Sequence, residues 1–278
     1  MSQKTLTASP CESRNRVARA GYNFDIDSID MGCIHRLETA LTDRTTTYSD
    51  AGVNIDAMNT AVLRMRDHVR STYTPGVLSD VGSFGGIFGL NWKEYEEPVL
   101  VSSIDGVGTK LKVAFAMNKH DTVGADLVCH CVNDILVQGA RPLFFLDYFA
   151  TGKLNDEVLV DVIKGMSEGC RSAGVALLGG ETAEMPGMYP DGEYDLAGTI
   201  VGVVDRSKVI DGSTITPGDA VIGLASNGLH TNGFSLARHV LFDKAGLAPD
   251  SCPTQLSGMS VGNVLLATHR CYAAGVLP

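Results

Sequence analysis

The feature that most constrains the fold of this chain is a six-residue turn between an apolar run and a helical segment. The run 98–104 is typical of a buried strand and 111–117 of a helix, and Asp105-Gly106-Val107-Gly108-Thr109-Lys110 joins them. Glycines let backbone N–H groups approach an anion, and a helix N-terminus favours phosphate. The aspartate repels an anion, so it indicates a bridging cation, for which Mg²⁺ is the best candidate. A plain glycine turn capped by Asp or Thr explains these residues equally well, and the spacing is not that of a Walker A motif.

Strands and amphipathic helices alternate along the chain. The periodicity predicts strands at 98–104, 143–149, 175–178, 196–204 and 220–225, and helices at 57–69, 111–117, 126–138, 156–173 and 234–245. Gly179-Gly180 is expected to end the third strand. This order is the signature of an α/β or α+β fold.

Three parts are expected in the chain. Residues 1–47 are polar and lack apolar periodicity, which predicts a flexible extension with a short helix at 31–41. Residues 48–212 are predicted to form an N-terminal domain. A boundary near the glycine and proline residues of 212–218 leaves 213–278 as a partial second domain, and its roughly 60 residues are few for an independent core.

Composition indicates a globular protein and disfavours some partners. The 278 residues are 44% hydrophobic and 19% charged. A net charge of −10 disfavours non-specific binding to nucleic acid or to anionic membranes. The seven cysteines match no disulfide framework, and no run approaches transmembrane length. We therefore expect a reducing, cytoplasmic setting, with no nucleic-acid or membrane partner.

Most histidines carry no functional signal in the sequence. Cys129-His130-Cys131 is better explained by buried cysteines beside an incidental histidine than by a zinc site, since a second ligand pair is absent. The polar surroundings of four others predict surface positions: His68, His120, His239 and His269.

Two further acidic segments follow the logic of the first turn. Asn133-Asp134 precedes the end of a helix at Gly139, and Glu181 follows Gly179-Gly180. Asp105, Asp134 and Glu181 are thus expected on three separate loops, and hard oxygen ligands from separate loops suit Mg²⁺. Each acid alone is explained more simply as a solvated turn residue. Asp147 follows an apolar strand, where a structural cap is the favoured interpretation.

The segment Ser226–Gly233 has a different character. It joins a predicted strand to a helix with glycines and hydroxyls but no carboxylate, which makes an anion cradle. His230 within it is able to donate to a phosphate or to act as an acid or base near neutral pH. A hydrogen-bonded turn histidine is the simpler interpretation of this residue taken alone.

Taken in order, these segments resemble the aminoimidazole ribonucleotide synthetase, or phosphoribosylformylglycinamidine cyclo-ligase, family. The matching stretches are 48–56, 105–111, 120–124, 131–134 with 138–140, 144–148 with 150–153, 179–189, 230–236 and 265–267. The run Gly179-Gly-Glu-Thr-Ala-Glu-Met-Pro-Gly-Met-Tyr189 is the most specific of them. The resemblance spans about residues 48–270.

The resemblance implies a two-domain α/β (α+β) fold and a homodimer in which N-terminal sheets pair into a barrel, with ATP beside that interface. It also implies a reaction. ATP activates the formyl amide oxygen of formylglycinamidine ribonucleotide, and an amidine nitrogen closes the ring to aminoimidazole ribonucleotide in purine biosynthesis. Mg²⁺ then neutralises charge on the transferring phosphoryl group.

Site residues follow from the same resemblance. His230, Asp105 and Asp134 are the expected catalytic residues, and Asp105, Asp134 and Glu181 the metal ligands. The substrate side is expected at Ser226, His230 and Asn232. The expected nucleotide-binding residues are Gly82, Gly85, Gly86, Asp105, Gly106, Gly108, Thr109, Lys110, Asn133, Glu181 and Thr182.

Two departures from the family pattern keep other functions open. Arg66 stands where the family commonly has lysine. The family also continues beyond position 278, so the second domain is expected to be truncated and part of the substrate site missing. The alternatives are an inactive nucleotide-binding or dimerising fragment, and another ATP-dependent member of the same superfamily.

Overall fold

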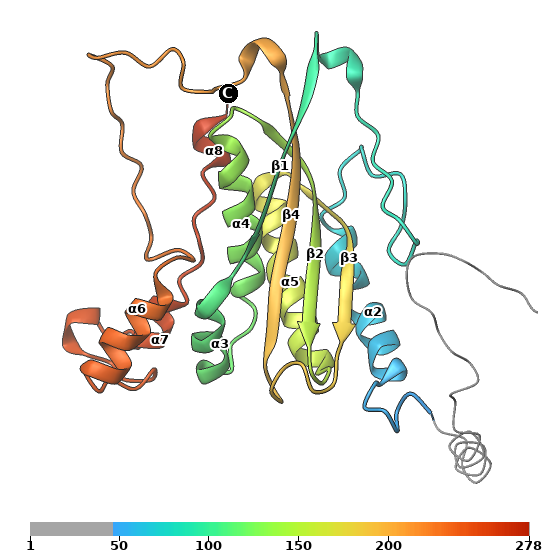
Figure 1. The fold of residues 1–278 in the computed structure, drawn as a ribbon, viewed down its shortest axis with the longest axis vertical. Coiled ribbons are helices and arrows are strands. Elements are labelled where there is room, and N and C mark those ends of the chain that lie inside the picture. Colours follow the sequence, from blue (N-terminus) through green and yellow to red (C-terminus); the bar gives the residue numbers. More distant parts are fainter. Residues whose placement is uncertain (1–46, 278) are drawn as a thin grey trace, which may run out of the picture. The chain divides into compact units, whose positions relative to one another are not determined.

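A four-stranded mixed sheet organises the described part of the chain. The computed structural model describes residues 47–277, so the predicted extension and the helix at 31–41 lie outside the described residues apart from Thr47. The strands are β1 (Pro98–Gly106), β2 (Arg141–Thr151), β3 (Ala176–Glu184) and β4 (Tyr194–Asp205), in the spatial order β1-β4-β2-β3 (Figure 1).

Strand direction follows from the connections. β4 is antiparallel to both of its neighbours, β1 and β2, whereas β2 and β3 are parallel. Parallel neighbours need a crossover, and helix α5 (Asp156–Ala173) supplies it. Asn155 caps this helix by accepting the N–H groups of Glu157 and Val158, and Gly174 ends it in the left-handed region.

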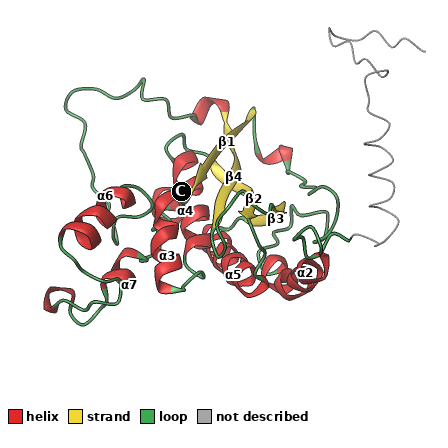
Figure 2. Cartoon of the chain, turned by 60° about the horizontal axis from the view of Figure 1, so that its bottom comes forward, coloured by secondary structure: helices red, strands yellow, loops and turns green. Residues whose placement is uncertain are grey.

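Three long helices form a layer on one face of the sheet: α2 (Ile55–Arg70), α4 (Val123–Leu136) and α5 (Figure 2). α4 is the most enclosed, because every residue in it except Asn133 and Asp134 is buried. A Cβ atom added at Gly124 would lie 2.1 Å from the Val162 carbonyl oxygen, so glycine permits the close packing of α4 on α5. Asn133 and Asp134, near the C-terminal end of α4, are therefore the polar side chains of this helix that remain partly exposed.

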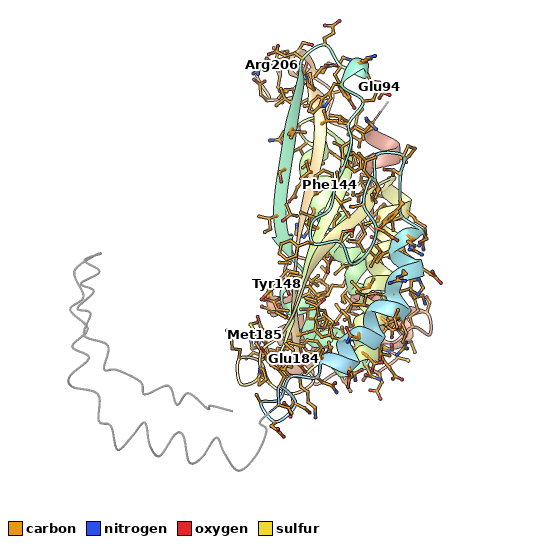
Figure 3. All side chains as sticks on the ribbon, turned by 90° about the vertical axis from the view of Figure 1, so that its right-hand side faces the viewer. Glu94, Phe144, Tyr148, Glu184, Met185 and Arg206 are labelled. Carbon is orange, nitrogen blue, oxygen red and sulfur yellow. The ribbon has the colours of Figure 1, made fainter. Side chains whose placement is uncertain are left out.

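The opposite face of the sheet exposes apolar side chains. Leu100 and Ile104 of β1 are 57% and 69% exposed, and they alternate with Val101 and Ser103, which are less exposed. Tyr148 of β2 is also exposed. Figure 3 labels Phe144 and Tyr148 along this strand, between Glu94 and Arg206 at one end of the sheet and Glu184 and Met185 at the other. One face of the sheet is therefore a core, and the other is apolar and has no helix from residues 47–277 packed on it.

Short helices lie after β1 and in the C-terminal part of the chain. A 3₁₀ turn (Gly108–Lys110) and α3 (Leu111–Met117) follow β1. Later elements are α6 (Phe234–Arg238), a π-helical stretch (His239–Lys244), α7 (Val261–Leu265) and α8 (Ala273–Val276), and further 3₁₀ turns lie at Trp92–Glu94, Arg206–Lys208 and Thr254–Leu256. α7 packs on α3 and α8 on α4, so the last residues are tied to the sheet domain.

Most predicted elements are confirmed, and two expectations are wrong. Residues 220–225 form no strand, and Val221 and Ile222 are 100% and 83% exposed. A strand needs a partner for its backbone groups, and no described strand lies beside this segment. Gly179-Gly180 does not end β3, which continues to Glu184. A Cβ atom at Gly180 would lie 2.2 Å from Asp147 Oδ1, so this glycine serves close packing inside the sheet rather than a turn. None of the described helices is long and apolar enough to cross a membrane.

Candidate functional site

Two neighbouring side-chain contacts join β1 to α4. Ser103 and Asp105 are two residues apart on β1 and therefore share a face, while His130 and Asp134 are four apart on α4 and share a side. Ser103 Oγ donates to Asp134 Oδ2 over 2.8 Å, and His130 Nε2 lies 3.0 Å from Asp105 Oδ2. The two contacts can form together because two residues of a strand and four residues of a helix each advance about 6–7 Å along the axis of their element.

These contacts bring three possible metal ligands together. Single ligand atoms of Asp105, His130 and Asp134 all lie within 4.8 Å of one another. Asp105 Oδ1 also accepts the N–H of Gly106 over 2.7 Å. The two carboxylates are half-exposed, whereas the His130 imidazole is buried behind them. We refer to Asp105, His130, Asp134, His230 and His269 as the histidine–carboxylate site.

The C-terminal segment supplies the remaining histidines. The Thr231 hydroxyl lies 2.9 Å from His130 Nδ1 and 3.3 Å from His269 Nδ1. The rings of His230 and His269 stack with centroids 4.1 Å apart. Burial, and then the neighbouring cations, lower the pKa of His269 to about 3 and also lower the pKa of His230. The His269 imidazole is therefore neutral at physiological pH.

His230 has an unusual backbone conformation for a residue with a side chain. Its φ is +62°, in the left-handed region, which costs roughly 1 kcal/mol for a non-glycine residue. Its carbonyl oxygen accepts from Lys110 Nζ over 3.0 Å, and its ring stacks on His269. His230 Nε2 is buried and has no hydrogen-bond partner among the described residues. A buried polar atom without a partner is costly, and a bound molecule could satisfy it.

A buried ion pair anchors this loop. Lys110 and Asp126 side chains are fully buried and in contact at 2.8 Å. Lys110 Nζ donates to the carbonyl oxygens of His230 and Ala267 as well, and Asp126 Oδ1 accepts the N–H of His269. Burial lowers the pKa of Lys110 and raises that of Asp126 to about 6. The Lys110 ammonium thus has three partners within the protein and no exposed atom.

A cavity of about 400 Å³ opens beside this cluster. Its lining residues are His130, Asn133, Asp134, Leu136, Val137, Leu224, His269, Tyr272 and Val276. Asn133 Nδ2 donates to the Arg270 carbonyl oxygen, and Asn133 Oδ1 accepts the N–H of Tyr272. The polar end of α4 is therefore bound directly to the C-terminal segment.

A second cavity, of about 500 Å³, lies at the β3 edge of the sheet. We call it the glycine-loop pocket, because Gly82, Gly85 and Gly86 line it together with Glu181 and Thr182. Cβ atoms added at Gly82 or Gly85 would meet nothing within 4 Å, so this part of the loop is loosely packed. The size is that of a small-molecule site.

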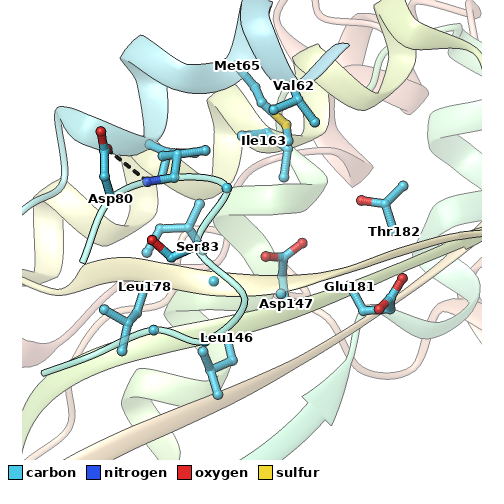
Figure 4. A pocket seen from close by; sticks show the side chains of 18 of the residues that line it. Val62, Met65, Asp80, Ser83, Leu146, Asp147, Ile163, Leu178, Glu181 and Thr182 are labelled. Atoms are coloured by element: carbon cyan, nitrogen blue, oxygen red, sulfur yellow. Dashed lines mark hydrogen bonds between the residues drawn. The ribbon is translucent and has the colours of Figure 1, made fainter. Parts of the chain in front are cut away.

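Asp147 is the carboxylate at the floor of the glycine-loop pocket. In Figure 4 it rises from β2 towards Met65, Val62 and Ile163, between Ser83 and Thr182. Desolvation raises its pKa to about 7. A carboxyl group that titrates near neutrality in a cavity is a site candidate rather than the structural cap that the sequence favoured.

The predicted site residues thus fall into two groups in one chain. Across the sheet, Asp105 pairs with Gly198, Gly198 with Asp147, and Asp147 with Gly180, which precedes Glu181 on β3. Asp105 and Gly180 are therefore three strand spacings apart, or about 14 Å. Asp105, Asp134 and Glu181 therefore do not meet around one ion within a chain. Nor do they lie on three loops, because they belong to β1, α4 and β3.

The other predicted residues lie near one group or the other. Gly106, Gly108, Thr109 and Asn133 adjoin the histidine–carboxylate site, where Thr109 Oγ1 contacts Ser235 Oγ at 2.9 Å. Ser226 Oγ accepts the N–H of Gly228 within its own loop, and Asn232 is exposed.

Three residues in or beside the histidine–carboxylate site are not predicted by the sequence patterns: His130, His269 and Asp126. The sequence favours an incidental His130 and surface positions for His120 and His269, but all three histidines are buried. No sequence pattern assigns a role to Asp126. The four-residue spacing of His130 and Asp134 on one predicted helix was an available signal for the first. His269 and Asp126 meet only through tertiary contacts, which the sequence does not display.

Comparison with known proteins places the fold in one class. Residues 92–204 match the family described as "AIR synthase related protein, N-terminal domain". Among solved structures, thiamine-monophosphate kinase from Stenotrophomonas maltophilia K279a aligns with a TM-score of 0.51 at 18% identity, covering 76% of this chain and 62% of that one. The described sheet and helices therefore have the AIR synthase-related fold.

Curated relatives define the family more narrowly. Phosphoribosylformylglycinamidine cyclo-ligase of Syntrophotalea carbinolica is 61% identical over 231 residues, which cover 83% of this chain and 66% of the relative. The enzyme of the same name from Geobacter sulfurreducens is 58% identical over 237 residues, covering 85% and 68%. The chain belongs to the phosphoribosylformylglycinamidine cyclo-ligase family, and it spans about two thirds of the length of these relatives.

Proposed function

We propose that this chain carries the nucleotide and metal part of an ATP-dependent cyclo-ligase, which converts formylglycinamidine ribonucleotide to aminoimidazole ribonucleotide in purine biosynthesis. The observation that carries the proposal is the 58% identity with a cyclo-ligase of which the chain covers 68%. The paired carboxylates of the histidine–carboxylate site support it, because phosphoryl transfer depends on charge neutralisation. A cytoplasmic location fits the five described cysteines, which are all free thiols.

The proposed chemistry has two steps. The formyl amide oxygen attacks the γ-phosphorus of ATP, the bond from γ-phosphorus to the bridging oxygen breaks, and ADP leaves. The amidine nitrogen then attacks the activated carbon, inorganic phosphate departs with the former amide oxygen, and the nitrogen loses a proton as the ring closes. An amide oxygen is a poor leaving group and a phosphate ester is a better one, so ATP lowers the barrier to ring closure.

The donor set of the histidine–carboxylate site fits a divalent cation. Asp105 and Asp134 offer carboxylate oxygens from a strand and a helix that are fixed to each other. Two carboxylates with room for water and phosphate oxygens are what Mg²⁺ commonly uses. When bound, Mg²⁺ supplies charge neutralisation for the phosphoryl group. The chain's own contribution is to hold the two carboxylates at fixed separation.

His230 is the proposed acid–base residue on the substrate side. Its Nε2 is buried without a partner among the described residues, and its lowered pKa keeps the ring neutral near pH 7. A neutral imidazole is able to accept the proton that the amidine nitrogen releases. Ser226 and Asn232, which belong to the same loop, are proposed to bind the substrate.

A homodimer is part of the proposal. The exposed apolar face with Leu100, Ile104 and Tyr148 is suited to burial against a second sheet. In a dimer that closes two sheets into a barrel, an edge of one sheet lies beside an edge of the other. Asp105 of one chain and the glycine-loop pocket with Glu181 of its partner are thereby proposed to form one composite ATP site, since about 14 Å separates these groups within a chain. In this arrangement residues 48–212 form the ATP-binding and dimerisation domain and 213–278 a partial second domain.

The direct experiment is an assay of the purified chain with formylglycinamidine ribonucleotide, ATP and Mg²⁺. Aminoimidazole ribonucleotide as product, lost in His230→Ala, is the expected result. Mg²⁺-dependent ATP binding without product favours an inactive nucleotide-binding fragment. ATP consumption without this product favours another ATP-dependent activity of the same superfamily. Absence of ATP binding contradicts the proposal in every form.

A further inference from the structure

We propose that Asn133, His269, Thr231 and His130 form a hydrogen-bond chain with one fixed direction, and that this chain positions the Asp105 carboxylate. Its consequence for metal binding rests on the proposed function. The hydrogen-bond direction itself does not, because it follows from contacts within the protein.

The direction begins at Asn133, whose amide orientation is fixed by two backbone groups. Its Nδ2 lies 2.8 Å from the Arg270 carbonyl oxygen, which only accepts. Its Oδ1 lies 3.0 Å from the Tyr272 N–H, which only donates. A flipped amide would place two donors together and two acceptors together. The Nδ2 group of Asn133 is therefore a donor.

His269 is the next member. Asn133 Nδ2 also lies 3.0 Å from His269 Nε2, so that nitrogen accepts and carries no proton. An imidazole with a bare Nε2 is neutral and carries its proton on Nδ1. His269 Nδ1 therefore donates to the Thr231 hydroxyl over 3.3 Å. The tautomer of His269 is thus assigned from the backbone contacts of Asn133.

Thr231 passes the direction on to His130. Its hydroxyl oxygen has accepted from His269, and its own proton points to His130 Nδ1, 2.9 Å away. His130 then carries its proton on Nε2, which lies 3.0 Å from Asp105 Oδ2. Each member of the chain is satisfied, and the last donor faces a carboxylate. His130 and Thr231 are buried, so water does not compete with these bonds.

This assignment decides the role of His130. Proximity alone allows His130 to be a third metal ligand, and a nitrogen ligand would favour a transition metal over Mg²⁺. A ring nitrogen that carries a proton does not ligate a metal. His130 is accordingly a positioning residue for Asp105, and the cation is left with carboxylate oxygens, as suits Mg²⁺. The C-terminal segment, through His269, thereby orients a carboxylate on β1.

The decisive test is the tautomeric state of the histidines in the full chain. Long-range ¹H–¹⁵N NMR at pH 7.5, with assignments from His130→Gln and His269→Gln, distinguishes a proton on Nδ1 from one on Nε2. The expected result is Nε2–H for His130 and Nδ1–H for His269, with the His130 proton retained after addition of Mg²⁺. A bare Nε2 on His130, or loss of its proton when Mg²⁺ binds, would overturn the proposal and make His130 a ligand.

A matched pair of variants tests the link through Thr231. Thr231→Ser keeps the hydroxyl, and Thr231→Val replaces it with a methyl group of similar size. The valine variant is expected to lose the fixed His130 tautomer and to bind Mn²⁺, measured by electron paramagnetic resonance, several-fold more weakly, whereas the serine variant keeps both. His130→Leu should weaken Mn²⁺ binding about tenfold. His239→Gln, on the surface, is the control. Equal behaviour of the serine and valine variants contradicts the proposal.

Discussion

The histidine–carboxylate site and the glycine-loop pocket differ in how far the chain itself completes them. In the first, Asp105, His130, Asp134 and His269 all have partners, whereas His230 Nε2 has none among the described residues, and a buried ion pair holds the surrounding loop. In the second, Asp147 is desolvated, and a Cβ atom added at Gly82 or Gly85 would meet nothing within 4 Å. The first site is preorganised, and its geometry exists before any ligand arrives. The second has the openness expected of a surface that a ligand or a partner chain completes.

The largest effect is expected from removing the anchor of the preorganised site. Lys110→Met leaves the Asp126 carboxylate buried without its cation, which should lower the free energy of unfolding by about 3–5 kcal/mol. Denaturant unfolding measures it. Lys112→Met is the matched control, because its ion pair with Glu193 is partly exposed and is worth at most about 1 kcal/mol. Adding Asp126→Asn to Lys110→Met should recover part of the loss. Equal losses in the two lysine variants would show that the buried pair is not an anchor.

The next effect concerns the cation. Asp105→Asn and Asp134→Asn each remove a proposed charged ligand and should weaken Mg²⁺-dependent ATP binding about ten- to a hundredfold. Isothermal titration of ATP with and without Mg²⁺ measures this. Ser103→Ala, which removes only the hydrogen bond to Asp134, should give a smaller loss. Unchanged Mg²⁺ dependence in both aspartate variants contradicts the assignment of these carboxylates to the cation.

Acid should loosen the preorganised site through His269. The folded state lowers the pKa of His269 from 6.5 to about 3, so it binds fewer protons than the unfolded chain between these values. The contribution of the neutral His269 to the free energy of unfolding is therefore fully present above pH 6.5. It is lost as the pH falls below that value, by about 1–2 kcal/mol at pH 4.5. Unfolding curves at both pH values measure the loss. His269→Gln should show a shallower dependence, and a slope equal to that of the wild type would contradict it.

The glycine-loop pocket should respond to pH in the opposite sense. The pKa of Asp147 is raised from 3.8 to about 7, so the folded state binds the extra proton and loses stability as the pH rises between these values. Asp147→Asn should therefore stabilise the chain at pH 8 by about 1–2 kcal/mol and leave it unchanged near pH 4. Asp195→Asn, at an exposed position, controls for net charge. Stabilisation of equal size at both pH values would contradict the assignment.

The sequence predicted the layered fold well where periodicity and packing agree. The helices at 111–117 and 156–173 match the structure in full, because their apolar spacing coincides with the buried face. The strand expected at 220–225 failed because apolar character alone does not supply a pairing partner. The prediction that Gly179-Gly180 ends the third strand failed because glycine serves both turns and close packing.

The site was predictable in part for similar reasons. Asp105 and Asp134 stand out locally, and the structure brings them together. The joining contacts of His269 and Asp126 link residues 143 positions apart, which no local pattern reveals. The separation of Glu181 from Asp105 follows from the strand order β1-β4-β2-β3, which periodicity does not fix.

The most direct measurement of the composite site is complementation between two inactive variants. Asp105→Asn and Glu181→Gln chains are unfolded and refolded separately and as an equal mixture, and Mg²⁺-dependent ATP binding is titrated in each. If the two regions meet across a twofold dimer, each mixed dimer holds one intact site, and about a quarter of the wild-type sites should return in the mixture. No recovery in the mixture, with wild-type chains regaining binding by the same procedure, contradicts the composite site.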